Sequence, residues 1–180
     1  AIMKAVRGAV ISLSSLNLDK YEGKDLREEL KKLSDERLFT VYAALKADIS
    51  VDEIFEITKI DRWFLNKLKN LVEHERRLRS EKLTRALYAE CKRLGYPDHE
   101  LEALSGQKIP YHRKAVYKMV DTCAAEFAAE TPYFYSTYDE YAHDEATPFI
   151  KESTKKRIIV IGSGPIRIGQ GIEFDYSSVH

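Results

Sequence analysis

The chain has 180 residues, 44% of them hydrophobic, which is enough for one domain with a well-buried core and a smaller second piece. Lysine and arginine total 29, and aspartate and glutamate also total 29, so the formal net charge is zero. Because no net field draws the chain toward nucleic acid or anionic lipid, neither is expected as a partner. The longest apolar runs are far shorter than the roughly 18–20 residues of a membrane-spanning helix, and no stretch resembles a signal peptide, which predicts a cytoplasmic protein.

The first residues, AIMKAVRGAV, open directly on an apolar and basic helical pattern. Such an opening is expected at an internal boundary of a longer chain. From there, apolar residues at helical spacing predict amphipathic helices over about residues 26–33, 35–45, 50–57 and 61–78. Ser50, with Glu53 three positions later, has the spacing of a capping box, and Asp61 is a good N-cap for the fourth helix.

Three more helices are predicted further along the chain. They cover about residues 81–94, a short stretch capped by Asp98, and residues 116–129. Gly95 and Pro97 should stop the first of them, because glycine tolerates a left-handed cap and proline cannot extend a helix. The bulk of the chain is therefore predicted to be all-helical.

Cysteines and tyrosines in this part are expected to be structural. Cys91 and Cys123 have no second Cys or His at short metal-ligand spacing, so both are predicted to be reduced, buried thiols. Tyr133, Tyr135 and Tyr138 follow, and we expect their rings to be buried and to pin the linker to the helical domain.

Helix-turn-helix DNA binding is one reading of the segment SVDEIFEITKIDRWFLNKLKN, which has a short capped helix, a turn and a second helix. A DNA reader normally carries a clear basic stripe, whereas here four glutamates would repel phosphates: Glu53, Glu56, Glu73 and Glu75. The other reading is an assembly module, a set of linked helices that buries aromatic side chains against another copy or domain.

A weak internal repeat accompanies these helices. Shifting the sequence by 47 positions places Leu101, Leu104 and Ser105 where Ile54, Ile57 and Thr58 stand. Repeats of this kind indicate duplicated helical hairpins that pack on each other.

The sequence pattern changes from helical to strand-like near the end of the given chain. Residues 157–161, RIIVI, form a β-branched run bounded by glycine, which predicts a buried parallel strand. Gly162 and Gly164 then allow a sharp turn, and Gly169 extends that freedom. Four residues separate Gly164 from Gly169 where the dinucleotide fingerprint has two, so a nicotinamide or flavin site is disfavoured. A tight strand-to-helix turn without any ligand is the alternative.

Arg167 is the candidate functional side chain of this loop. A guanidinium beside flexible glycines suits a carboxylate or a phosphate. An ion pair with Glu173 or Asp175 is the structural alternative, and the sequence does not choose between the two.

The sequence contains two long, ordered words: VDTCAAEFAAETPYFYSTYDE and, after a linker and a strand, GSGPIRIGQGIEFDYSSVH. They resemble the large chain of carbamoyl-phosphate synthetase. LFTVYAALKADISVDEIFEITKIDRWFL is similar to the helical oligomerization domain of that family, and MKAVRGAV resembles the tail of its first ATP-grasp half. Together these words cover nearly the whole chain.

This resemblance implies a mainly α fold with a short C-terminal α/β piece. Residues 1–20 would be the tail of the preceding ATP-grasp half, 21–130 the helical oligomerization domain, 131–155 a linker, and 156–180 the start of the second pre-ATP-grasp domain. The loop residues Gly162, Gly164, Arg167, Gly169 and Glu173 would border the path toward the second synthetase site.

The resemblance also implies an ATP-dependent ligase that makes carbamoyl phosphate from bicarbonate and glutamine-derived ammonia, with two phosphorylations, for pyrimidine and arginine synthesis. ATP with Mg²⁺ or Mn²⁺ is expected in the full-length enzyme, and a glutaminase small subunit and self-association are its expected partners. The 180-residue chain alone is expected to have no catalytic residue, cofactor or metal and to be inert.

The sequence departs from the family pattern between Gly106 and Val116, where a fuller helix is usual, so an irregular or abbreviated helix is expected there. Ile166 also stands where relatives often have a polar residue.

Overall fold

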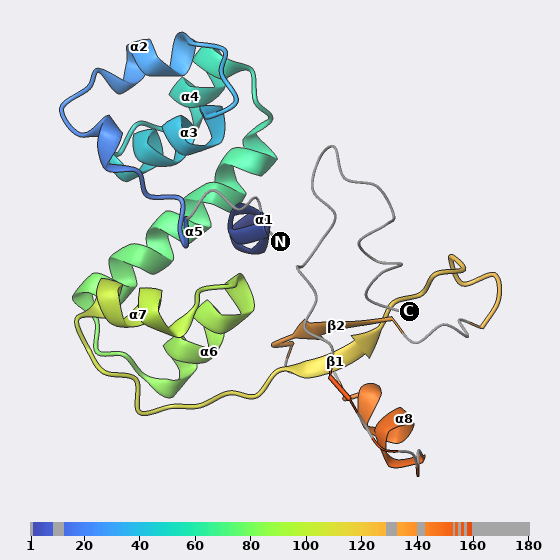
Figure 1. Cartoon of the computed structure of the whole chain (residues 1–180). Helices are drawn as coiled ribbons and strands as arrows, with labels where there is room; N and C mark the ends of the chain where they lie inside the picture. The colour runs from blue at the N-terminus through green and yellow to red at the C-terminus, as the bar shows by residue number, and fades with distance from the viewer. Residues whose placement is uncertain are drawn as a thin grey trace. The chain divides into compact units, whose positions relative to one another are not determined.

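A computed structural model describes residues 2–8, 13–128, 133–139, 143–152, 154, 156, 158 and 159. The chain divides into two compact units, Ala1–Lys114 and Ala115–His180 (Figure 1). The first unit contains the 3-10 turn η1 (Asp19–Tyr21) and the helices α1 (Ile2–Gly8), α2 (Leu26–Lys31), α3 (Arg37–Lys46), α4 (Val51–Thr58), α5 (Arg62–Ser80), α6 (Arg85–Leu94) and α7 (Asp98–Ser105). The second unit contains β1 (Val116–Met119), β2 (Phe134–Thr137) and α8 (Ala146–Glu152). The predicted mainly α fold is confirmed.

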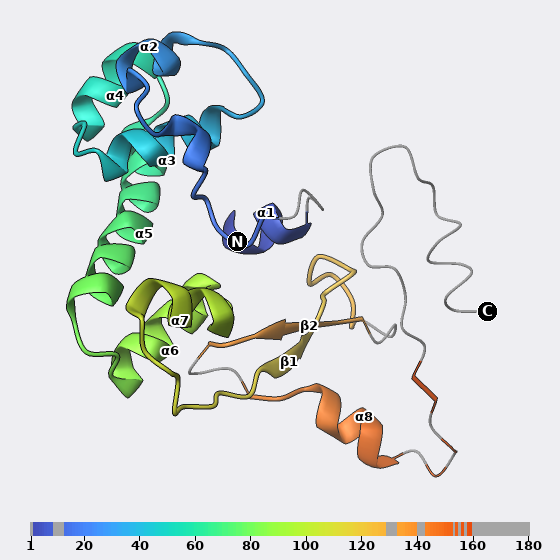
Figure 2. The same cartoon turned by 60° about the vertical axis from the view of Figure 1, so that its left-hand side comes forward.

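Helix α5 is the axis of the first unit. It is 19 residues long, and the other helices gather around its two ends, α2 to α4 at one and α6 with α7 at the other (Figures 1 and 2). Its buried positions recur at helical spacing, as the apolar pattern predicts. They are Leu65, Leu68, Leu71, Val72, Glu75 and Leu78. The core of this unit also takes in Met3, Val6 and Leu16, which precede the range predicted for the helical domain.

Side-chain caps set the start of several helices. The Ser50 hydroxyl accepts from the Glu53 amide at 3.1 Å, and the Asp61 carboxylate accepts from the Trp63 amide at 2.7 Å, so both predicted caps are confirmed. The Glu53 carboxylate pairs with Arg27, with Nε and Oε1 2.5 Å apart. The start of α4 is therefore tied to α2 through the Glu53 side chain, which pairs with Arg27 where a capping box would return it to the Ser50 amide.

The predicted duplicated hairpins are present, but the prediction that they pack on each other is wrong, because α3 and α4 contact one end of α5 and α6 and α7 contact the other (Figure 1). Helices α3 and α6 each have ten residues, and the 47-residue shift takes all of α4 onto α7. Buried side chains coincide under the same shift in the pairs Val41/Tyr88, Ala44/Cys91, Ile49/Tyr96 and Ile54/Leu101. Both hairpins also end in a left-handed residue, Lys59 with φ 56° and Gly106 with φ 65°.

The second hairpin is not followed by a helix equivalent to α5. Residues 107–115 contain no helix, although an irregular or abbreviated one was expected there. The shift places Lys108 where Asp61 caps α5, and a lysine cannot accept the hydrogen bond that a cap supplies. The Ile109 amide instead donates to the Glu102 carboxylate at 3.0 Å, which holds the chain against α7.

Three predicted helix bounds are wrong. Helix α2 ends at Lys31, so Leu33 lies outside it and is 84% exposed. Helix α6 begins at Arg85 instead of residue 81, because the Thr84 hydroxyl caps it by accepting from the Leu87 amide. Pro97 is the cap position of α7, and the Asp98 carboxylate pairs instead with Lys92 at 2.9 Å.

The helix predicted over residues 116–129 is wrong. Residues 116–119 form β1, which pairs antiparallel with β2 in the register Val116↔Thr137 to Met119↔Phe134. The β-branched and aromatic residues of VYKMV favour an extended chain there. The alanine-rich stretch after β1 forms a turn and not a helix. The Asp121 carboxylate stabilises this turn by accepting from the amides of Cys123 at 2.9 Å and Ala125 at 2.6 Å.

Burial in the second unit also differs from the prediction. Cys123 is half-buried, since it lies in this turn and not on a helix. Tyr133 and Tyr135 are exposed, because strand alternation turns side chains of a two-stranded sheet to both faces and no second layer covers them among the described residues. Tyr138 is half-buried, and Cys91 is fully buried as predicted.

Two carboxylates brace β1. Asp144 accepts from the Tyr117 amide at 2.9 Å, and Glu145 accepts from the Met119 amide at 2.7 Å and from the Lys118 ammonium. The bond from Lys118, followed by that from Met119, lowers the pKa of the Glu145 carboxyl. These contacts compensate for the small size of a two-stranded sheet, which is marginal by itself.

The predicted strand at residues 157–161 is described only at Ile158 and Ile159. Both are exposed and make no strand pairing. The other residues of that strand lie outside the described residues.

Replacing Gly95 by alanine should destabilise the first unit more than replacing Gly106, although both glycines are left-handed. It has φ +99°, its added Cβ would lie 3.2 Å from the Met3 Cβ, and its carbonyl accepts from Arg7 of α1 at 2.7 Å. Gly95→Ala is therefore expected to lower the free energy of unfolding by about 2 kcal/mol in urea denaturation. Gly106→Ala, with φ +65° and nothing within 4 Å, is the matched control and should lose only about 1 kcal/mol. Equal losses would contradict a role for the Met3 contact.

Candidate interaction surface

The loop that the sequence singles out is not available for a geometric description. Gly162, Gly164, Arg167, Gly169 and Glu173 all lie outside the described residues, as do Ile166 and Asp175. Their role stays a prediction. The structure instead provides a candidate site on the first unit.

An apolar groove of about 710 Å³ lies between α1, α3, α5 and α6. Most of its lining is aliphatic or aromatic. The lining residues are Ile2, Met3, Leu38, Val41, Ile60, Trp63, Phe64, Lys67, Leu68, Asn70, Leu71, Arg93 and Leu94. The groove is thus built from parts of the sequence that are far apart.

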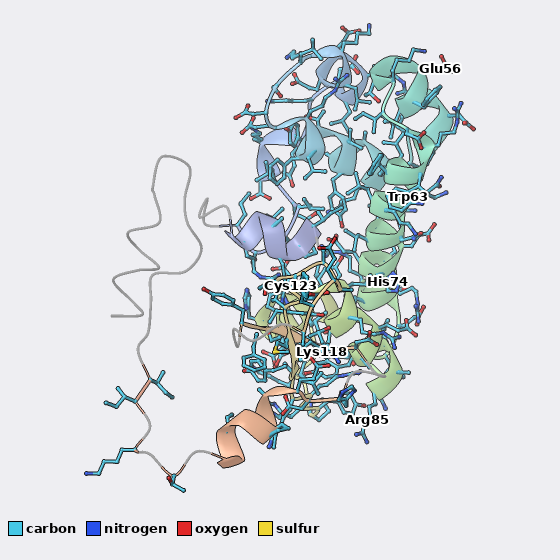
Figure 3. All side chains as sticks on the ribbon, turned by 90° about the vertical axis from the view of Figure 1, so that its right-hand side faces the viewer. Glu56, Trp63, His74, Arg85, Lys118 and Cys123 are labelled. Atoms are coloured by element: carbon cyan, nitrogen blue, oxygen red, sulfur yellow. The ribbon has the colours of Figure 1, made fainter. Side chains whose placement is uncertain are left out.

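Trp63 and Phe64 form the exposed aromatic edge of the groove. They are 60% and 58% exposed, and their rings meet edge to face with centroids 5.0 Å apart. Consecutive residues of a helix point in different directions, so the burial of Leu65 against the core leaves these two rings outside. Figure 3 places Trp63 on the part of α5 nearest α4, with His74 further along the same helix. Large exposed aromatics beside an apolar groove mark a binding surface.

The charge in the groove has one sign. Lys67 and Arg93 line it, and the Lys67 Nζ lies 5.1 Å from the centre of the Trp63 ring. None of the described residues that line the groove is a carboxylate. The groove therefore suits an apolar side chain that arrives with negative charge beside it.

A buried carboxylate lies under the α3 side of α5. Glu75 is 2% exposed, and its Oε1 accepts from the Tyr42 hydroxyl at 2.7 Å and from Asn17 Nδ2 at 3.1 Å. The Lys46 Nζ lies 3.6 Å from the other oxygen, Oε2. These groups connect α5 with α3 and with the segment before η1.

Burial controls the titration of nearby groups. It raises the pKa of the Tyr42 and Tyr96 hydroxyls far above the usual range, so both remain donors at any ordinary pH. The Tyr96 hydroxyl donates to the Leu71 carbonyl at 3.3 Å. Burial also raises the pKa of the Cys91 thiol to about 12, which keeps it protonated and unreactive. These groups have structural roles.

The cations around the α4–α5 turn are engaged with carboxylates. Arg62 Nε lies 2.6 Å from Asp52 Oδ1, its guanidinium lies 3.7 Å from the centre of the Phe55 ring, and Lys59 pairs with Glu56 at 2.7 Å. The outward face at the start of α5 is aromatic. This arrangement does not present the basic stripe of a DNA reader.

The described residues contain neither a candidate metal cluster nor a candidate membrane span. No group of three or more His, Cys, Asp or Glu side chains in that part could hold a metal ion. No helix there is long and apolar enough to cross a membrane.

Comparisons with known proteins identify the family of the chain. Residues 1–121 match the family described as the carbamoyl-phosphate synthetase large chain, oligomerisation domain, and residues 154–180 match the carbamoyl phosphate synthase preATP-grasp domain. The helical unit is therefore of the class of oligomerisation domains. The chain belongs to the carbamoyl-phosphate synthetase large chain family.

Individual relatives support the same assignment. The carbamoyl phosphate synthase large chains of Lachnoclostridium phytofermentans and Methanosarcina barkeri are each 45% identical over all of this chain. That of Thermoanaerobacter pseudethanolicus is 45% identical over 99% of it. The chain spans only 17–18% of the length of these relatives. Nothing among these matches supports the DNA-binding alternative.

Sequence reasoning did not find the groove. Three consecutive large apolar residues at the start of α5, Trp63 to Leu65, were the available signal, since a helix cannot bury all of them on one face. Their number indicates an outward-facing aromatic surface, but not the helices that complete it.

Tyr42→Phe should destabilise the first unit more than Tyr21→Phe does. Tyr42 donates to the Glu75 carboxylate, whereas the Tyr21 hydroxyl accepts from the neutral Thr40 hydroxyl at 2.9 Å. We expect losses of about 2 and about 1 kcal/mol in the free energy of unfolding, because a bond to a buried charge is stronger than a neutral one. Urea denaturation of both variants makes the comparison, and an equal or smaller loss for Tyr42→Phe would contradict the role given to Glu75.

Proposed function

We propose that the chain is the self-association module of a carbamoyl phosphate synthase large chain and performs no catalytic step itself. The match of residues 1–121 to an oligomerisation domain carries this proposal. A helical core of its own and an exposed apolar groove in the same residues support it. The module holds other parts of the enzyme together by burying its apolar surface.

The activity of the whole enzyme follows from the family. The large chain would make carbamoyl phosphate from bicarbonate and ammonia, with two ATP and Mg²⁺ or Mn²⁺, and a glutaminase small subunit would supply the ammonia from glutamine. We place the enzyme in the cytoplasm, in pyrimidine and arginine synthesis.

The loop near the second synthetase site belongs to the same proposal. The match of residues 154–180 to a preATP-grasp domain supports a place for Gly162, Gly164, Arg167, Gly169 and Glu173 in the second half of the enzyme. Arg167 would then hold a carboxylate or phosphate there.

Self-association of the chain should depend on its concentration. Sedimentation velocity from low to high micromolar protein is expected to show a monomer that converts to a discrete oligomer. A strict monomer over that range would contradict the proposal for this chain.

The purified chain should not turn over ATP. We expect no phosphate release above the buffer background with ATP, Mg²⁺, bicarbonate and ammonia, because the ATP-binding parts of the family lie outside these residues. Measurable turnover that increases with the concentration of the chain would contradict the non-catalytic role.

A further inference from the structure

We propose that the groove of one copy receives the Leu33 loop, residues 32–36, of a second copy, and that the exchange is reciprocal around a twofold axis. This inference rests on the proposed self-association, and it identifies the surface and the side chains that carry it. The groove needs an apolar side chain accompanied by negative charge. The Leu33 loop has both.

Leu33 is the apolar part of this loop. It is 84% exposed in the connection between α2 and α3, where the sequence pattern would place it on a buried helix face. A leucine so exposed does not occupy its own groove. Its burial in the groove of another copy would remove its apolar surface, and that of Trp63 and Phe64, from water.

Charge complementarity selects this occupant. Asp35 stands two residues after Leu33 in the loop, and Lys67 with Arg93 lines the groove. Glu36 is paired with Lys20, so Asp35 is the carboxylate that faces the cations of the groove in this proposal. The one cation beside Leu33, Lys32, is paired with Glu29 at 2.6 Å. Two grooves that met face to face would oppose like charges, whereas exchanged loops set carboxylates against cations.

The loop and the groove lie close enough for a reciprocal contact. Leu38 lines the groove and stands five residues after Leu33, so the two are at most about 17 Å apart along the chain. With a twofold axis beside the loop and the groove, each copy inserts its Leu33 loop into the groove of the other copy. Such an isologous contact closes on a dimer and leaves no free groove.

A charge-swap experiment on the 180-residue chain tests the pairing. Asp35→Lys and Lys67→Glu should each raise the dissociation constant of the dimer by about 10-fold or more, measured by sedimentation. The double variant should return it to within about 3-fold of the parent, because the opposite charges face each other again. All the altered side chains are exposed, and circular dichroism checks that the fold is retained.

Lys69→Glu is the matched control. Lys69 is an exposed lysine of the same helix that does not line the groove, and its charge change should alter the dissociation constant by less than about 2-fold. A chain that associates equally well in every variant, or a double variant no better than the singles, overturns the inference and leaves self-association standing. A chain that is monomeric throughout overturns the proposed function as well.

Discussion

The buried carboxylate of Glu75 is the interaction on which the first unit depends. A charge with 2% exposure is costly unless other groups compensate for lost water. Here Tyr42 and Asn17 donate to Oε1, while Oε2 accepts no hydrogen bond from any described residue and has the Lys46 ammonium 3.6 Å away. Because these partners come from α3 and from the segment before η1, the charge is satisfied only when both are docked on α5. A purely apolar α5 would gain burial but would not require this one arrangement.

The same helix explains why the groove exists. One face of α5 carries Glu75 and the leucines that are buried in the core. Helices α1 and α6 cover the remaining apolar surface of α5 only in part, which leaves the groove. The first turn of α5 therefore carries Trp63 and Phe64 without a cover. The fold of the monomer and its binding surface are consequences of a single helix that has more apolar surface than its neighbours bury.

Much of the helical unit could be predicted from the sequence, because its information is local. Ser50, Asp61 and Gly95 act within a turn of the helix ends that they define. The β1–β2 hairpin could not, since alanine-rich residues near Cys123 favour a helix locally and only the Asp121 side chain and the pairing with β2 oppose it. The groove was hidden for a related reason: Ile2 and Leu94 meet only in the folded chain.

Family membership was likewise readable from the sequence, because it depends on ordered words and not on packing. The geometry of the loop at Arg167 was not, since the described residues do not include it. One of the words that carry the resemblance, residues 38–65, includes Trp63 and Phe64 of the groove, yet the word by itself does not show that these side chains are exposed.

The two hairpin ends differ in a way that affects where the unit opens first. Lys59 adopts a left-handed conformation that Gly106 adopts without strain, and a side chain there costs about 1 kcal/mol. The packing around the turn that leads into α5 thus keeps Lys59 in a backbone conformation that its side chain disfavours. The same strain lowers the cost of a local opening at this turn, which lies beside the aromatic edge of the groove.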